Sequence, residues 1–245
     1  MSQNIYDDQV FFKKYMDLRQ DRLCANNLEE KPARIDMIGD LKNKRVLDLG
    51  CGTGDDCFEY LKMGASKVVG IDVSDNMISE AKKRHGSTDI EFILMDMEKL
   101  SEIPYKFDVV VSSLAIHYIR DFSSLCNNVY NILDKSGIFL FSQEHPIFTA
   151  DKRGVTWLKD IDDEVTGMIV ADYPENGKRE THWLVDGVVK YHRTFSVIIN
   201  SIVDAGLIIR KVKEPIVDDE IISISPSLSR CRHVPDYLYV LSEKE

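Results

Sequence analysis

The chain has 245 residues and a formal net charge of −10, with 31 Lys and Arg against 41 Asp and Glu. Nucleic-acid binding needs clustered basic residues, and the run Lys82-Lys83-Arg84 is typical of a solvated helix face, so the composition disfavours a polyanionic partner. The hydrophobic fraction of 44% is that of a globular protein. No apolar stretch has the length of a membrane span, and the N-terminal residues lack a signal pattern. Five cysteines without a CxxC pair predict a cytoplasmic protein with neither a disulfide framework nor a metal.

The predicted elements alternate between strands and helices along most of the chain. Residues 6–23 carry an aromatic stripe at helical spacing, and a second helix is expected at about 32–40. Apolar runs then predict strands at 46–49, 67–71, 90–95, 107–112, 138–141, 207–213 and 236–241. Helical patterns follow at 55–63, after Ser74, at 121–133 and from Thr194. This alternation predicts an α/β protein with a doubly wound sheet.

Two stretches interrupt the alternation. Residues 147–192 mix aromatic and charged side chains, and a segment this long between core elements is usually functional. We expect it to cap the substrate mouth, with a β-hairpin around Asp186-Gly187. Residues 215–235 are expected to form a long loop. Three of its side chains either reach the substrate or are ordinary surface charges: Arg230, Arg232 and His233.

The stretch 46–54, read VLDLGCGTG, combines a buried strand, a glycine turn and the start of a helix. Such a turn lets a ligand approach the backbone closely, and the helix start adds free N–H groups. An acid, Asp48, precedes the glycines. A second acid, Asp72, ends the next strand about 20 residues past the turn, where a carboxylate binds ribose hydroxyls in nucleotide-binding folds. Asp72 alone would also suit a helix cap, but together these features predict nucleoside binding.

The residues after the turn indicate which nucleoside. A dinucleotide fingerprint requires glycine at position 55, whereas this chain has Asp55 followed by Asp56. Two carboxylates would repel a pyrophosphate and would suit a cationic ligand or one without phosphate. S-adenosylmethionine carries a sulfonium, an ammonium and an adenosine, and it meets these requirements.

The stretch resembles motif I of class I S-adenosylmethionine-dependent methyltransferases, in their small-molecule, type 11-like branch, and the resemblance is strong over 40–145. It implies a seven-stranded Rossmann-like sheet with an antiparallel last strand. It also implies one domain throughout 1–245. We divide this domain into an N-terminal helical lid (1–42), a cofactor-binding core (43–146), a substrate cap (147–192) and the C-terminal part of the sheet (193–245).

The resemblance also implies the cofactor residues. Tyr15 and Arg19, four apart on one helical face, would lie near the methionine carboxylate, unless that helix only packs on the core. Asp96 and Met97 would meet the adenine, although Asp96 would also suit a solvated strand end. The full expected set is Tyr15, Arg19, Asp48, Gly50, Cys51, Gly52, Thr53, Gly54, Asp72, Val73, Met77, Asp96, Met97, Ser112, Leu114 and His117.

Methyl transfer needs alignment and, for a protonated acceptor, a base. The candidates are His117, Glu144, His145 and His192, with His145 favoured because it follows the fifth strand, although a His-Pro pair is also an ordinary turn. The N-P-P-Y tetrapeptide of nucleic-acid amine methyltransferases is absent after the fourth strand. We therefore expect a small-molecule methyltransferase that releases S-adenosylhomocysteine and is a monomer or homodimer. A non-catalytic S-adenosylmethionine-binding module and an enzyme transferring another group remain the alternatives.

Overall fold

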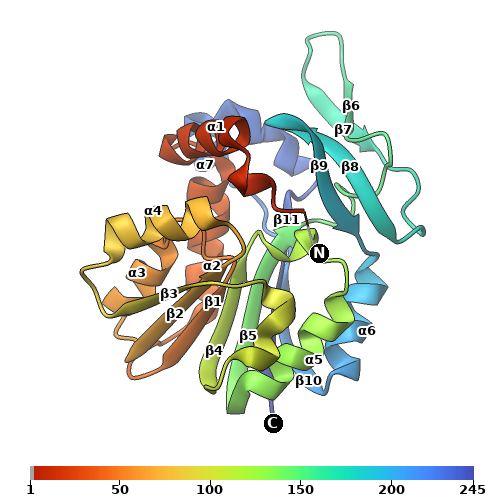
Figure 1. The fold of residues 1–245 in the computed structure, drawn as a ribbon. Helices are drawn as coiled ribbons and strands as arrows, with labels where there is room; N and C mark the ends of the chain where they lie inside the picture. The colour runs from red at the N-terminus through yellow and green to blue at the C-terminus, as the bar shows by residue number, and fades with distance from the viewer. Residues whose placement is uncertain (1–2) are drawn as a thin grey trace.

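A computed structural model describes residues 3–245 (Figure 1). The main sheet contains β1 (Arg45–Leu49), β2 (Lys67–Asp72), β3 (Ile90–Leu94), β4 (Phe107–Ser113), β5 (Leu133–Glu144), β10 (Leu207–Lys213) and β11 (Tyr237–Lys244). The α-helices are α1 (Gln9–Gln20), α2 (Lys31–Ile38), α3 (Asp55–Lys62), α4 (Asp75–His85), α5 (Phe122–Ile132), α6 (Phe195–Asp204) and α7 (Asp219–Ile224). Short 3-10 or π-helical turns are η1 (Ile5–Asp7), η2 (Asn26–Glu30), η3 (Met97–Glu102), η4 (Ile116–Tyr118) and η5 (Pro226–Arg232).

The seven strands follow the order β10-β11-β5-β4-β1-β2-β3. β1 pairs in parallel with β2 and β4, and β5 pairs in parallel with β4, whereas β11 is antiparallel to both of its neighbours. The prediction of a seven-stranded Rossmann-like sheet with an antiparallel last strand is confirmed. In such a sheet the parallel strands end on one edge, and ligands bind there beside the point where the strand order reverses.

Helices cover both faces of the sheet, so the fold is doubly wound (Figure 1). Successive residues of a strand point to opposite faces, and β1 illustrates this. Leu47 packs in the cluster with α5 and α6. Val46 packs in the cluster with α2, α3 and α4. Because both faces of the central strands are buried, β1, β2 and β4 read as continuous apolar runs, which is why the sequence located them.

Side-chain caps fix where several helices begin. Ser74 accepts a hydrogen bond from the Met77 N–H at the start of α4, and Thr194 caps α6 in the same way. Asp8 caps α1, so the predicted helix at 6–23 is shorter and begins after the turn η1. These caps satisfy N–H groups that have no partner within the helix.

The structure corrects three local predictions. The segment 215–235 is not a plain loop, because it contains α7 and η5. The predicted hairpin exists as β8 (Gly177–Trp183) and β9 (Val185–His192), but its turn lies at Leu184, and Asp186-Gly187 belongs to β9. Leu184 adopts a left-handed φ of 63° that the sequence does not signal. A second hairpin, β6 (Thr156–Lys159) with β7 (Val165–Ile169), was not predicted.

The N-terminal segment and the insertion lie next to each other at one end of the sheet. The Gln3 side chain hydrogen-bonds the backbone of Gly187 and Val189 in β9, and Lys14 donates to the carbonyl of Leu184. The β6–β7 hairpin instead projects away from the body of the protein (Figure 1). Within residues 3–245, no helix combines the length and apolar content needed to cross a membrane.

Candidate functional site

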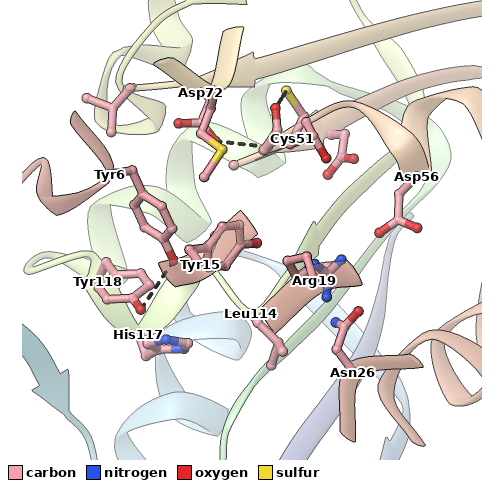
Figure 2. A pocket seen from close by; sticks show the side chains of 18 of the residues that line it. Tyr6, Tyr15, Arg19, Asn26, Cys51, Asp56, Asp72, Leu114, His117 and Tyr118 are labelled. Carbon is pink, nitrogen blue, oxygen red and sulfur yellow. Dashed lines mark hydrogen bonds between the residues drawn. The ribbon is translucent and has the colours of Figure 1, made fainter. Parts of the chain in front are cut away.

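A cavity of about 400 Å³ lies at the carboxyl ends of the parallel strands. The glycine turn after β1, the end of β2 and the residues after β3 line one side of it. Residues from the N-terminal segment, β4, η4, β5 and β8 close the other side. Figure 2 shows Tyr15 and Arg19 of the N-terminal helix facing the strand ends that carry Cys51 and Asp72. The sheet therefore brings residues that are distant in sequence to one enclosed site.

Glycines make the turn after β1 possible, for two different reasons. Gly50 has a φ of 74°, and a Cβ there would lie 2.5 Å from the Cβ of Ala115, so any side chain would collide with the protein. Gly52 also has a positive φ, of 53°, but nothing in the protein lies within 4 Å of a Cβ built there. Gly52 lines the cavity, so that open space is available for a ligand to approach the backbone.

Asp72 at the end of β2 is held rigidly with its carboxylate at the cavity. One oxygen accepts the N–H of Gly52 at 3.0 Å and the other accepts the N–H of Ser74 at 2.9 Å. Burial raises the pKa of Asp72 to about 6, against the lowering effect of these two hydrogen bonds. Each oxygen keeps a second lone pair, so the ionised carboxylate can accept hydrogen bonds from two adjacent hydroxyl groups.

Further carboxylates make the turn side of the cavity acidic. Asp48 lines the cavity, and within the described residues its Oδ1 is buried without a hydrogen-bond partner. Burial, with the nearby Asp56 carboxylate, raises the pKa of Asp48 to about 7. Asp56 pairs with the buried Arg34 at 2.6 Å and remains ionised. Acidic groups facing a cavity favour a ligand with positive charge and disfavour a phosphate.

Aromatic rings of the N-terminal segment form the wall opposite the turn. Tyr6 and Tyr15 both line the cavity, with ring centroids 5.2 Å apart. Trp183 of β8 lies 6.2 Å from the ring of Tyr15 and 5.4 Å from the fully buried Phe11. The aromatic stripe predicted from the sequence therefore packs against the core and also lines the cavity. Core packing and a place at the site, the two alternatives for this helix, do not exclude each other. Arg19 reaches the cavity from the same helix.

The end of the cavity near β5 carries His117, Tyr118 and Glu144. The buried His117 ring accepts the Glu144 backbone N–H at its Nδ1, at 3.5 Å. Burial lowers the pKa of His117 to about 4, so the ring is neutral at physiological pH. Glu144 forms an ion pair with Lys190 of β9. Burial by itself would raise the pKa of Glu144, but the Lys190 ammonium lowers it overall, and the carboxylate stays charged.

Most of the predicted cofactor residues line this cavity. Two do not. Gly54 supports the start of α3, where a Cβ would lie 2.6 Å from the Phe92 ring. Ser112 is buried and donates to the Leu49 carbonyl at 2.8 Å, while its neighbour Ser113 lines the cavity. The predicted residues at the cavity are Tyr15, Arg19, Asp48, Gly50, Cys51, Gly52, Thr53, Asp72, Val73, Met77, Asp96, Met97, Leu114 and His117.

Two of the four catalytic candidates lie outside the cavity lining, including the favoured one. His145 pairs through Nε2 with Glu214 at 2.8 Å and accepts the Ile147 N–H at Nδ1. His192 contacts Thr149 at Nδ1 and donates from Nε2 to a backbone carbonyl. Both nitrogens of each ring have protein partners. Their positions favour structural roles, and the remaining candidates, His117 and Glu144, are the ones at the cavity.

Several residues that line the cavity were not predicted from the sequence. Two of them are Tyr6, from the aromatic stripe at 6–23, and Tyr118, which follows His117, and their hydroxyl oxygens are 3.4 Å apart. Of the aromatic residues in the insertion, only Trp183 lines the cavity. Arg230 does so as well, whereas Arg232 and His233 do not. Nothing in the local pattern distinguishes Arg230 from its neighbours.

The fold and site define a class of protein, a Rossmann-like enzyme that binds an adenosine-bearing cationic ligand. The residues present fit S-adenosylmethionine. Gly52 leaves room for the ligand beside the backbone, Asp72 offers paired acceptors suited to ribose hydroxyls, and the acidic groups suit a cation. The buried Oδ1 of Asp48, which has no hydrogen-bond partner among residues 3–245, is a further acceptor beside the turn.

Comparison with known proteins names the family. Residues 40–187 match a family model described as a methyltransferase domain. A crystal structure of an S-adenosylmethionine-dependent methyltransferase from Mesorhizobium loti is similar, with a TM-score of 0.82 and 34% identity over 93% of this chain and 100% of that chain. An uncharacterised protein of Haemophilus influenzae is 38% identical over 223 residues, covering 89% of this chain and 88% of that protein. The chain belongs to the class I S-adenosylmethionine-dependent methyltransferases, and S-adenosylmethionine is its cofactor.

A more distant relative has a named substrate. Juvenile hormone acid O-methyltransferase of Bombyx mori is 32% identical over 172 residues. That match covers 64% of this chain and 59% of the Bombyx protein, so the chain spans a little over half of that relative.

Proposed function

We propose that this methyltransferase transfers the methyl group of S-adenosylmethionine to a small, non-polymeric acceptor. One observation carries the proposal: a cavity of about 400 Å³, partly covered by the N-terminal segment and by Trp183, extends from the glycine turn to His117 and Glu144. This volume is in the range of small-molecule sites. The net charge of −10 gives no support to a nucleic-acid acceptor.

Bound S-adenosylmethionine supplies a methyl carbon on a positively charged sulfur that leaves as a neutral thioether. The chain's own task is therefore alignment and exclusion of water, with no acid needed for the leaving group. In this proposal Asp72 binds the ribose, Asp96 and Met97 bind the adenine, and Arg19 with Tyr15 binds the methionine carboxylate. The acceptor then lies at the other end of the cavity, beside His117 and Glu144.

We also propose that the N-terminal segment, described here over residues 3–42, acts as a lid and that part of 147–192 acts as a cap. The support for the lid is its closure over the cavity: Asp7 accepts from the Ser74 hydroxyl at 2.6 Å, beside the ribose acid Asp72. Polar contacts of this kind can break and re-form as ligands enter. For the cap, only the β8–β9 hairpin is involved, through Trp183, because β6–β7 projects away.

Two measurements test the proposed function. Calorimetry should show binding of S-adenosylmethionine and S-adenosylhomocysteine in the micromolar range. An assay for released S-adenosylhomocysteine across a panel of small hydroxyl, amine and acid compounds should then find turnover. Efficient methylation of bulk RNA or protein, with no small compound accepted, would contradict the proposed substrate class.

A further inference from the structure

The acceptor end of the cavity carries a negative charge that faces inward. Glu144, the last residue of β5, lines the cavity and keeps 26% of its side chain exposed. Its Oε1 holds the Lys190 ammonium, whose own side chain is 7% exposed and does not line the cavity. Lys190 therefore lies behind the carboxylate and keeps it ionised, while Oε2 remains available to a ligand as a hydrogen-bond acceptor.

The neighbouring His117 presents the opposite hydrogen-bonding character. Its Nδ1 accepts the backbone N–H of Glu144, so in the neutral ring the proton is on Nε2. A neutral ring with Nε2–H is a hydrogen-bond donor. The acceptor end thus offers one carboxylate oxygen and one N–H. A hydroxyl group can donate to the first and accept from the second at the same time, whereas an ammonium has no lone pair for the N–H.

The cationic side chains at the cavity do not offset this charge for an incoming anion. The Arg230 guanidinium is bound to the Asp236 carboxylate and to the Ser227 carbonyl. Arg19 comes from the N-terminal helix and lies toward Asp56 and the glycine turn (Figure 2). Within the described residues, Glu144 is the charged side chain that lines the cavity beside His117 and Tyr118, whereas the nearby Arg193 guanidinium lies outside the lining and donates to the carbonyls of Ile116 and Tyr191.

We propose that the acceptor is a neutral aromatic hydroxyl compound, held through its O–H by Glu144 and through its oxygen by His117 Nε2–H, and that carboxylic acids are rejected. This rests on the proposed function above. The rings of Tyr6, Tyr118 and Trp183 supply the aromatic enclosure. In the reaction the hydroxyl oxygen forms the new bond to the methyl carbon, and the carbon–sulfur electron pair stays on sulfur. The hydroxyl proton passes to the Glu144 carboxylate and then to solvent.

The proposal separates this chain from its Bombyx relative, which is named for an acid substrate. A carboxylate placed where the hydroxyl binds would face Glu144 inside an enclosed site, where like charges repel strongly. We therefore expect a phenol to bind with a Kd about tenfold or more below that of a benzoate of the same size.

Ligand binding can be followed through Trp183 itself. The chain has two tryptophans. Trp157 packs on Phe148 outside the cavity lining, so a Trp157→Phe protein reports on Trp183 alone. With this protein saturated with S-adenosylhomocysteine, catechol should change the fluorescence with a Kd about tenfold or more below that of benzoate. Equal or tighter binding of benzoate, or no binding of catechol, overturns the proposal.

Variants assign the discrimination to one carboxylate. Glu144→Gln should bring the ratio of the benzoate Kd to the catechol Kd close to one. A ratio that stays at the wild-type value overturns the proposal. Because this variant leaves the buried Lys190 unpaired, Glu144→Gln/Lys190→Met removes both charges and should give the same result if the single variant folds poorly. Glu175→Gln is the matched control, because it breaks a Lys–Glu pair at the exposed Lys152 and should keep the wild-type ratio.

Failure of the proposed function is distinguishable from failure of this inference. If S-adenosylhomocysteine does not bind in calorimetry, the function itself fails. If it binds and benzoates are preferred or methylated in place of phenols, the function holds and only the assignment of the acceptor is wrong.

Discussion

Binding of S-adenosylhomocysteine should depend on pH through Asp72. Burial raises the pKa of Asp72 to about 6 in the free protein. Ribose hydroxyls bind best to the ionised carboxylate, so below this pKa the ligand must first displace a proton. Affinity should therefore rise as pH increases through about 6 and level off above it.

The magnitude follows from the ionised fraction. With a pKa of about 6, roughly one Asp72 carboxylate in ten is ionised at pH 5 and nearly all are ionised at pH 7.5, so the Kd should be about tenfold higher at pH 5. Asp72→Asn keeps the shape but removes the charge. It should cost about 1.5–3 kcal/mol for each charge-assisted hydrogen bond lost and should flatten the pH dependence below 7.

Isothermal calorimetry with S-adenosylhomocysteine between pH 5 and 7.5 measures both effects. Asp48 is the necessary control, because burial raises its pKa to about 7 and it also lines the cavity. Asp48→Asn should leave a dependence centred near 6, whereas Asp72→Asn should remove that component. A Kd that stays constant over this range in the wild type, or an Asp72→Asn protein with the wild-type profile, would refute the assignment of Asp72.

Three further predictions concern the turn, a buried acid and the N-terminal helix. Gly50→Ala should unfold at a clearly lower temperature than wild type, because its Cβ would lie 2.5 Å from a neighbouring alanine methyl group. Gly52→Ala should lower the free energy of unfolding by only about 1–2 kcal/mol but should bind S-adenosylhomocysteine poorly. Equal melting temperatures of the two variants would contradict this. Burial raises the pKa of Glu29 to about 8, so the stability that Glu29 contributes should be lost as pH rises from about 4.5 to 8, and Glu29→Gln should be more stable than wild type by about 2–5 kcal/mol at pH 9 in urea unfolding. A stability difference between variant and wild type that is no larger at pH 9 than at pH 5 would count against it. Arg19→Gln should weaken S-adenosylhomocysteine binding by about 1.5–3 kcal/mol, while the exposed Arg22→Gln should not, and equal effects would exclude the carboxylate contact.

The sequence by itself determined the sheet and its cofactor edge. Strands buried on both faces are continuous apolar runs, and three closely spaced glycines after such a run predict a turn that a ligand can approach. The spacing from this turn to Asp72 follows from the length of one helix and one strand, so a local pattern was enough.

Only the tertiary structure decided which side chains line the cavity. The sequence does not distinguish His117, His145 and His192. In the structure, both ring nitrogens of His145 and of His192 contact protein partners, and neither residue lines the cavity. The charge of Glu144 likewise depends on Lys190, 46 residues further along the chain. Such contacts arise from how the insertion packs on the end of the sheet, and packing between distant segments leaves no periodic signal in the sequence.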